Sequence, residues 1–203
     1  MLKMYYNLPN GKSFAHVSRS CTSTLAAHAL KNFWPEKYEQ FIQQENIANS
    51  PQSFMYETWS NRLAPHCLVM VRNPIDRLNS LISRNLYSEE IIEAVLSACD
   101  RCMITTREVS KTIDIVKFHH ISPVCWIADN DSTFCLFPDV KKACELLEME
   151  YYPEIHENDL KHEPSDCVKQ QWECYLNDSI GLWEALSKSP NTTNEIIHRP
   201  MDS

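Results

Sequence analysis

The amino-acid sequence predicts an α/β protein, a single-domain three-layer sandwich in which helices flank a central parallel sheet. Short apolar segments with the character of strands alternate with longer segments of helical spacing, as in sheets built from right-handed crossovers. Two of the apolar segments end in a polar turn that opens a helix, which is typical of open α/β sheets. The chain of 203 residues is long enough for one domain with a full core.

The predicted strands are apolar runs bounded by turn residues. They lie at 13–18, 66–71, 113–118 and 133–137. The predicted helices carry apolar residues three and four positions apart. They cover 23–33, 36–46, 52–62, 74–86, 88–100, 139–148 and 165–187. We expect residues 1–203 to form one domain, with a core at about 13–187 and a loosely held tail at 188–203.

Composition limits the classes of function. The formal net charge is −8, so nucleic acid is not an expected partner. The N-terminal residues lack the apolar core of a signal peptide, and no apolar run approaches the roughly 20 residues that span a membrane. We therefore expect a soluble, cytoplasmic protein without a membrane anchor.

The nine cysteines are expected to be reduced thiols that pack in the interior. One C-x-x-C pair, Cys99 and Cys102, follows a helical pattern and so falls at a helix C-terminal end, where the helix dipole disfavours a thiolate. A structural zinc site needs a second pair of this kind, and the sequence has none. Neither a redox role nor a metal is expected.

The first polar turn lies within the run H-V-S-R-S-C-T-S-T-L at 16–25. A helix N-terminus offers unpaired N–H groups and the positive end of the helix dipole, and so favours an anion. The turn adds one cationic side chain and several small polar ones. These candidate anion-binding residues are Arg19, Ser20, Cys21, Thr22, Ser23 and Thr24. The plainer alternative is that Thr22 or Ser23 is only an N-cap.

This turn is not a Walker A loop, because the G-x-x-x-x-G-K-[ST] pattern is absent. The chain has only two glycines, Gly11 and Gly181, and neither lies in the turn. A P-loop kinase-like phosphotransferase is therefore the least favoured interpretation.

The second polar turn follows the apolar run at 66–71, which is suited to a central parallel strand. Arg72 stands at the C-terminal end of this strand, where ligands bind in open α/β sheets. Pro74 is placed for the first turn of the next helix, and Ser80 lies about two turns into it. We expect Arg72 and Ser80 to converge on one phosphate. Taken singly, Arg72 has the alternative of a surface salt bridge and Ser80 that of a solvated position.

The segment R-N-P-I-D-R-L-N-S at 72–80 resembles the 3′-phosphate motif of sulfotransferases that use 3′-phosphoadenosine 5′-phosphosulfate (PAPS). The run at 16–25 is similar to their 5′-phosphosulfate loop, commonly H-I-P-K-x-G-x-T-S-L. A weaker match, Y-L-N-D-S-I-G-L-W at 175–183, is similar to a helix near the end of Golgi-type and bacterial members. The resemblance spans the chain in order from about Phe14 to about Leu186. It implies a PAPS-dependent sulfotransferase with a P-loop NTPase-like fold.

The resemblance also implies a role for each matched residue. Arg19 falls at the family's lysine position and would stabilise the leaving phosphate with the loop hydroxyls. Arg72 and Ser80 would bind the 3′-phosphate.

The chain departs from the family at four positions. Arg19 replaces the loop lysine, Ser18 its proline and Cys21 its glycine, and Asn73 replaces the aspartate that often follows the 3′-phosphate arginine. A register shifted by one residue would put Ser18 at the lysine position, but Arg19 is preferred because that register also aligns Leu25.

The family's catalytic base is a histidine or glutamate on the segment before the 3′-phosphate strand. The histidine is absent at Asn49 and Ser50, and the nearest candidates are Glu57 and His66. For Glu57 the alternative is a solvated helix carboxylate, and for His66 it is a residue that opens its strand.

We therefore expect an enzyme that moves a sulfuryl group from PAPS to a hydroxyl or amine and leaves 3′-phosphoadenosine 5′-phosphate (PAP), with no metal. The acceptor stays open, since a glycan, a protein tyrosine and a small metabolite are all compatible. The alternative is a non-catalytic protein on the same fold that binds PAP, another nucleotide or a partner protein. The altered loop and the missing histidine favour that alternative.

Overall fold

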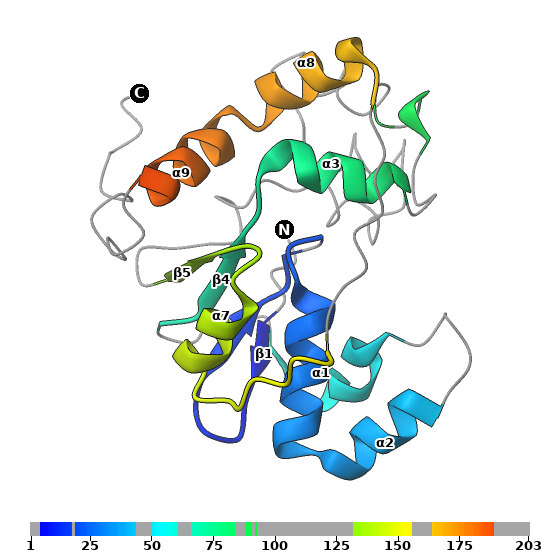
Figure 1. The fold of residues 1–203 in the computed structure, drawn as a ribbon, viewed down its shortest axis with the longest axis vertical. Coiled ribbons are helices and arrows are strands. Elements are labelled where there is room, and N and C mark those ends of the chain that lie inside the picture. Colours follow the sequence, from blue (N-terminus) through cyan, green and yellow to red (C-terminus); the bar gives the residue numbers. More distant parts are fainter. Residues whose placement is uncertain are drawn as a thin grey trace.

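The computed structural model describes residues 5–17, 19–43, 50–60, 66–83, 88–90, 92, 132–155 and 164–188. A five-stranded sheet lies at its centre (Figure 1). The strands are β1 (Tyr5–Asn7), β2 (Ser13–Ala15), β3 (Trp59–Ser60), β4 (Leu68–Val71) and β5 (Thr133–Leu136). Their order across the sheet is β3-β1-β2-β4-β5.

The sheet is mixed, which corrects the prediction of a parallel sheet. β2, β4 and β5 are parallel, with Phe14 opposite Leu68, whereas β1 is antiparallel to both of its neighbours. β1 joins β2 through a tight turn that contains Gly11 at a φ of 82°. The dipeptide Asn10-Gly11 is a strong hairpin signal, and the sequence prediction did not use it.

Six α-helices and one 3₁₀ helix are described. They are α1 (Thr22–Phe33), α2 (Pro35–Gln43), η1 (Pro51–Thr58), α3 (Pro74–Ser83), α7 (Val140–Leu146), α8 (Asp166–Tyr175) and α9 (Asn177–Lys188). In their described parts, the helices predicted at 23–33, 36–46, 74–86 and 139–148 are confirmed to within three residues at each end.

Two predicted helices differ from the structure. The segment 52–62 forms η1 and then β3, because Trp59 and Ser60 pair with β1 as an edge strand. The segment 165–187 forms two helices, α8 and α9, which meet at the buried Leu176. The first difference comes from pairing with a distant strand, which helical spacing alone does not reveal.

Two further predictions concern residues outside the described ranges. These are the strand at 113–118 and most of the helix at 88–100. Among the helices that the structure does describe, none is long and apolar enough to cross a membrane.

Helices cover both faces of the sheet. Alternate side chains of a strand point to opposite faces, so each face of the sheet presents apolar side chains to the helices that cover it. Leu68 and Met70 of β4 pack in one apolar cluster with α1 and α7. Val69 and Val71 pack in a second cluster, which Leu186 of α9 covers. Burial of each such side chain contributes roughly 1.5–3 kcal/mol. The two clusters hold the strands and α1 in place, and the two polar turns follow directly from these elements.

The carboxyl ends of the three parallel strands lie together at one end of the sheet, which we call its carboxyl edge. The chain leaves β2 through Val17 into the first polar turn and leaves β4 through Arg72 into the second. β5 ends beside them, since Phe137 N–H donates to Val71 O at 2.8 Å. α1 and α3 begin at this same edge (Figure 1). Two helix N-termini and three strand ends therefore surround the candidate site.

The segment after α7 packs on α1 around a buried histidine. His28 is 0% exposed, and its ring stacks on Tyr151 and Tyr152 at centroid distances of 5.3 and 6.0 Å. Its Nδ1 accepts from the Tyr152 N–H at 3.4 Å. Burial lowers the pKa of His28 from 6.5 to about 4, although Glu154 opposes that shift and Lys31 adds to it slightly. The ring is therefore neutral in the folded protein near neutral pH.

We expect the free energy of unfolding to fall as the pH drops from 6.5 to about 4. In this range His28 binds a proton in the unfolded chain and stays neutral in the folded chain, so acid favours the unfolded state. At about 1.4 kcal/mol per unit of pKa, the loss due to His28 is up to about 3 kcal/mol. Urea unfolding across this pH range measures it. His28→Phe keeps a ring between the tyrosines without an ionisable group, so its stability should depend less on pH. Equal slopes in both proteins would contradict this account.

Candidate anion-binding site at the sheet edge

The first polar turn is closed by two hydrogen bonds to one carbonyl. Ser20 N–H donates to Val17 O at 3.1 Å, and the Thr22 hydroxyl donates to the same oxygen at 2.7 Å. Val17 is 0% exposed, so the end of β2 anchors the turn in the core. Thr22 thus binds back to the turn and does not cap α1.

α1 begins without a side-chain cap. Its N-cap residue is Cys21, whose side chain makes no capping hydrogen bond. Ser23 does not cap it either, because its Oγ accepts from Gln52 Nε2 at 2.8 Å. The alternative that Thr22 or Ser23 serves only as an N-cap is therefore wrong. The first-turn N–H groups, which have no partner within the helix, receive no side-chain cap and can bind an anion.

Two buried hydroxyl groups lie beside this helix end. Ser20 and Thr24 are 0% and 4% exposed, and neither Oγ of Ser20 nor Oγ1 of Thr24 has a hydrogen-bond partner in the described part of the chain. A buried hydroxyl without a partner costs about 1–3 kcal/mol. Because an oxyanion accepts several hydrogen bonds at once, it is a ligand that suits these groups.

The backbone of the turn is strained on both sides of Ser20. Arg19 and Cys21 have φ values of 63° and 69°, in the left-handed region that costs a non-glycine residue roughly 1–2 kcal/mol. A left-handed residue next to one in another conformation can direct N–H groups to one side and form an anion-binding concavity, but here the Ser20 N–H is donated to Val17 O. Cys21 thus adopts a glycine-like conformation without being glycine. Its buried side chain, 2% exposed, holds it there by packing in the cluster that covers α1.

Arg72 connects the two polar turns. It lies directly after β4, is 7% exposed, and donates from Nη1 to Arg19 O at 3.3 Å. Its guanidinium carbon lies 4.4 Å from the centroid of the Phe137 ring, and such stacking suits the planar guanidinium. A fixed positive charge is thereby held against the strained turn, 53 residues away in sequence.

The second turn leads into α3 as the sequence predicts, with Pro74 as the first helical residue. Asn73 Oδ1 accepts from Ile75 N–H at 2.9 Å and from Asp76 N–H at 3.4 Å. Asn73 therefore caps α3, a position at which asparagine and aspartate are about equally good. Ser80 is half-buried on α3, about 9 Å of helical rise beyond Pro74.

The structure places the two candidate bases differently. Glu57 lies near the end of η1, which packs on α1, and its role as a base stays a prediction. His66 precedes the first residue of β4 and is exposed. Five residues lie between it and Arg72, and the six residue steps of extended chain correspond to roughly 20 Å. The fold thus brings Arg72 to Arg19 and leaves His66 at the opposite edge of the sheet.

Gln52 is the site residue that the sequence prediction missed. It comes from η1 and reaches the first turn of α1 through the bond to Ser23 Oγ. Its own Oε1 is buried and has no hydrogen-bond partner among the described residues. No motif or spacing in the sequence marks this residue, because its contact with α1 spans 29 positions.

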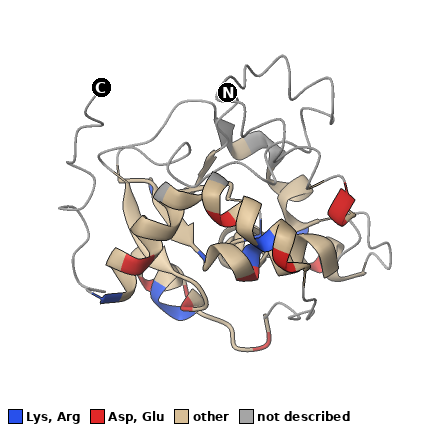
Figure 2. Cartoon of the chain, turned by 90° about the horizontal axis from the view of Figure 1, so that it is seen from above, with Lys and Arg blue, Asp and Glu red and all other residues tan. Residues whose placement is uncertain are grey.

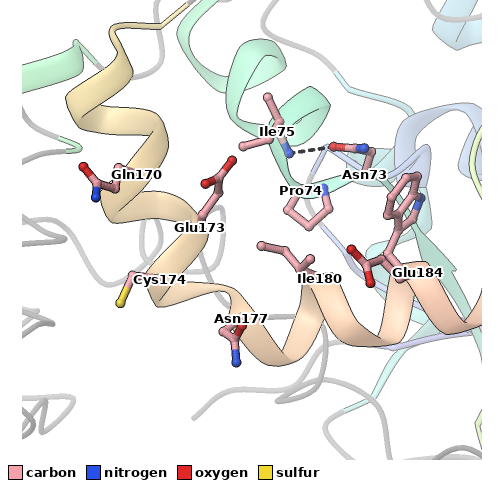
Figure 3. A pocket seen from close by; sticks show the side chains of 10 residues that line it. Asn73, Pro74, Ile75, Gln170, Glu173, Cys174, Asn177, Ile180 and Glu184 are labelled. Carbon is pink, nitrogen blue, oxygen red and sulfur yellow. Dashed lines mark hydrogen bonds between the residues drawn. The ribbon is translucent and has the colours of Figure 1, made fainter.

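A pocket of about 510 Å³ lies between the second polar turn, the start of α3 and the helices α8 and α9 (Figure 3). Two carboxylates, Glu173 and Glu184, stand on its walls beside apolar groups such as Ile180 and Trp183, and no lysine or arginine lines it. This lining suits a neutral or cationic group and disfavours a phosphate. This acidic pocket therefore borders the second polar turn at Asn73 and Pro74, and no residue of the first turn lines it.

The charge on the described surface is mixed. Acidic and basic positions are interspersed over the helices (Figure 2), and the chain as a whole is acidic. An anion at the sheet edge is therefore attracted by local groups, namely Arg19, Arg72 and the start of α1, and not by an extended basic face.

Apart from Cys21, the residues of this arrangement include no cysteine and no other potential metal ligand. In the described ranges, no three His, Cys, Asp or Glu side chains are grouped so that they could hold a metal. Burial raises the pKa of Cys135 and Cys144 to about 12, so both are protonated thiols. Cys99 and Cys102 lie outside the described residues.

Three comparisons with known proteins, against protein-family models, curated proteins and solved structures, found no match to this chain.

We expect His66→Gly to raise the free energy of unfolding by about 0.5–1 kcal/mol. His66 has a φ of 57°, and glycine removes the left-handed penalty of roughly 1–2 kcal/mol while adding entropy to the unfolded chain. Urea unfolding measures the change. Destabilisation by this substitution would show that the His66 side chain makes contacts the folded chain needs.

Proposed function

We propose that this chain is a sulfotransferase that moves a sulfuryl group from PAPS to a hydroxyl or amine acceptor and leaves PAP. One observation carries the proposal: Arg72 Nη1 lies 3.3 Å from Arg19 O. Neither motif alone would identify a ligand with a phosphate at each end. Their contact at the carboxyl edge of the sheet places a phosphate-type turn and a second cationic turn within one ligand's length.

The first turn would hold the 5′-phosphosulfate end of the ligand. The uncapped start of α1 supplies N–H donors and a positive dipole end. The hydroxyls of Ser20 and Thr24 are buried beside it without partners. Sulfuryl transfer builds negative charge on the leaving phosphate oxygen, and donors fixed in advance stabilise that charge most in the transition state. Arg19 would supply the cationic part of this stabilisation, with a planar fork where the family has a lysine.

The second turn would hold the 3′-phosphate. Arg72 is fixed by Arg19 O and by the Phe137 ring, so little side-chain entropy is lost when it binds an anion. Ser80 and the capped start of α3 lie beyond it. A ligand with a phosphate at each end would bridge the two helix starts. This explains why both turns carry anion-binding groups.

The second candidate function is a PAP-binding protein without transferase activity. It is favoured by the placement of His66 at the opposite edge of the sheet from Arg72. It is also favoured by the strained non-glycine turn. Glu57 is the remaining candidate base under the first function. A screen of hydroxyl and amine acceptors with labelled PAPS separates the two functions, because both predict PAP binding and only one predicts transfer.

We expect PAP to bind the folded chain and to raise its melting temperature, as any ligand selective for the native state must. Arg72→Ala should weaken PAP about 10- to 150-fold, which corresponds to the loss of one charge-assisted contact of roughly 1.5–3 kcal/mol. Titration calorimetry with PAP and with adenosine 5′-phosphate measures both effects.

Adenosine 5′-phosphate is the matched control for this experiment, because it lacks the 3′-phosphate. Arg72→Ala should weaken it much less than PAP, and Arg72→Lys, which retains charge, should fall between parent and Arg72→Ala. Equal losses for both nucleotides would assign Arg72 to the architecture of the turn. Binding of ATP without binding of PAP would overturn the proposed function.

We expect Arg19→Ala to lower single-turnover sulfuryl transfer by roughly 10²-fold or more, on the scale of losing one charge-stabilising donor. PAP affinity should fall less, since the interaction grows as the leaving group gains charge. Arg19→Lys restores the family residue and should retain or raise the rate. Transfer by Arg19→Ala at the parent rate would show that this arginine does not act on the leaving group.

A further inference from the structure

The hydrogen bond between Gln52 and Ser23 has a directional consequence for the candidate site. Gln52 Nε2 is a donor only, so at 2.8 Å the Ser23 oxygen must accept. The Ser23 proton is then left for another acceptor. Ser23 lies in the first turn of α1 and is half-buried. A donor at this end of the helix faces the region where α1 attracts an anion.

The other polar atom of the same side chain is also informative. Gln52 is 8% exposed, and its Oε1 is buried with no hydrogen-bond partner among the described residues. Oε1 is bonded to the same carbon as Nε2, so it lies at the same first turn of α1. A buried carbonyl of this kind carries a penalty until a donor reaches it. No described side chain supplies that donor.

We propose that Gln52 is a positioning residue of the anion site, and that the ligand bound there carries an O–H or N–H donor as well as its anionic group. Gln52 Nε2 orients the Ser23 hydroxyl to donate to the anion, while Gln52 Oε1 accepts from the ligand's own donor. This inference rests on the proposed function, because the anion is the 5′ end of the same ligand. It adds a chemical requirement that does not follow from the two polar turns. A bare oxyanion accepts the Ser23 proton that Gln52 Nε2 orients, but it offers no donor to Gln52 Oε1.

The test uses two probes that differ in this respect. Inorganic sulfate has no proton near neutral pH, whereas PAP has one free ribose hydroxyl, at the 2′ position, and an adenine amine. Gln52→Leu and Ser23→Ala should each weaken sulfate about 3- to 10-fold, the range for one neutral hydrogen bond. The double variant should lose no more than the larger single loss, because both changes remove the same donor. For PAP, Gln52→Leu should lose clearly more than Ser23→Ala.

Gln52→Glu separates positioning from packing, because it conserves the shape of the side chain. Its carboxylate accepts from the Ser23 hydroxyl, turns that proton away from the anion and adds repulsion. Sulfate should therefore bind Gln52→Glu more weakly than Gln52→Leu, and binding should improve as the pH is lowered and the carboxyl group is protonated. Ser53→Ala is the matched control in η1, because it removes an exposed hydrogen bond to Ser50 O without touching α1. It should bind both probes like the parent.

The outcomes distinguish this inference from the proposed function. If the Gln52→Leu and Ser23→Ala losses for sulfate multiply in the double variant, or if Gln52→Glu binds sulfate as the parent does, the positioning role is wrong. If Gln52→Leu and Ser23→Ala weaken PAP equally, the ligand donor is wrong. If PAP fails to bind the parent while the sulfate pattern holds, the proposed function fails and the role of Gln52 toward an anion stands. Thermal unfolding of each variant without ligand shows whether it is folded.

Discussion

The hydrogen bond from Arg72 to the carbonyl of Arg19 determines the geometry of the candidate site. It joins the end of β4 to the turn after β2. The parallel register of these strands, with Phe14 opposite Leu68, brings both strand ends to the same edge. Apolar clusters on the two faces of the sheet hold that register. The contact between the two cationic turns is thus a consequence of how the core packs.

The turn itself carries unfavourable terms that the core must offset. Arg19 and Cys21 are left-handed without being glycine, and Ser20 and Thr24 bury hydroxyls that lack partners. Strain and unsatisfied polar groups of this kind cluster at functional sites, because the surrounding structure holds them in place for a ligand. The proposed anion would accept from these hydroxyl groups together. Gln52 adds one further donor, the Ser23 hydroxyl that it orients, and one acceptor, its own Oε1. The acidic pocket between α3, α8 and α9 borders the second turn at Asn73 and has the opposite chemistry.

The parts of the fold that the sequence predicts depend on local signals. The apolar run before Arg72 and the proline that starts α3 are such signals, and both predictions are confirmed. The antiparallel part of the sheet consists of β1 and its pairing with β2 and β3. The spacing of residues within 52–62 does not show that Trp59 and Ser60 pair with β1. The candidate site also has a part that the sequence predicts and a part that it does not. Its motif residues can be recognised in the sequence, whereas the left-handed conformation of Cys21 and the hydrogen bond from Gln52 depend on tertiary packing.

The most direct test of the central claim is a crystal structure of the chain with PAP bound. The account predicts the 3′-phosphate within hydrogen-bond distance of Arg72 and Ser80. It predicts the 5′-phosphate against the first-turn N–H groups of α1 and the hydroxyls of Ser20, Ser23 and Thr24. The adenosine would bridge the starts of α1 and α3. PAP bound at another place, or bound with its phosphates away from both turns, would contradict the claim that the two turns form one site.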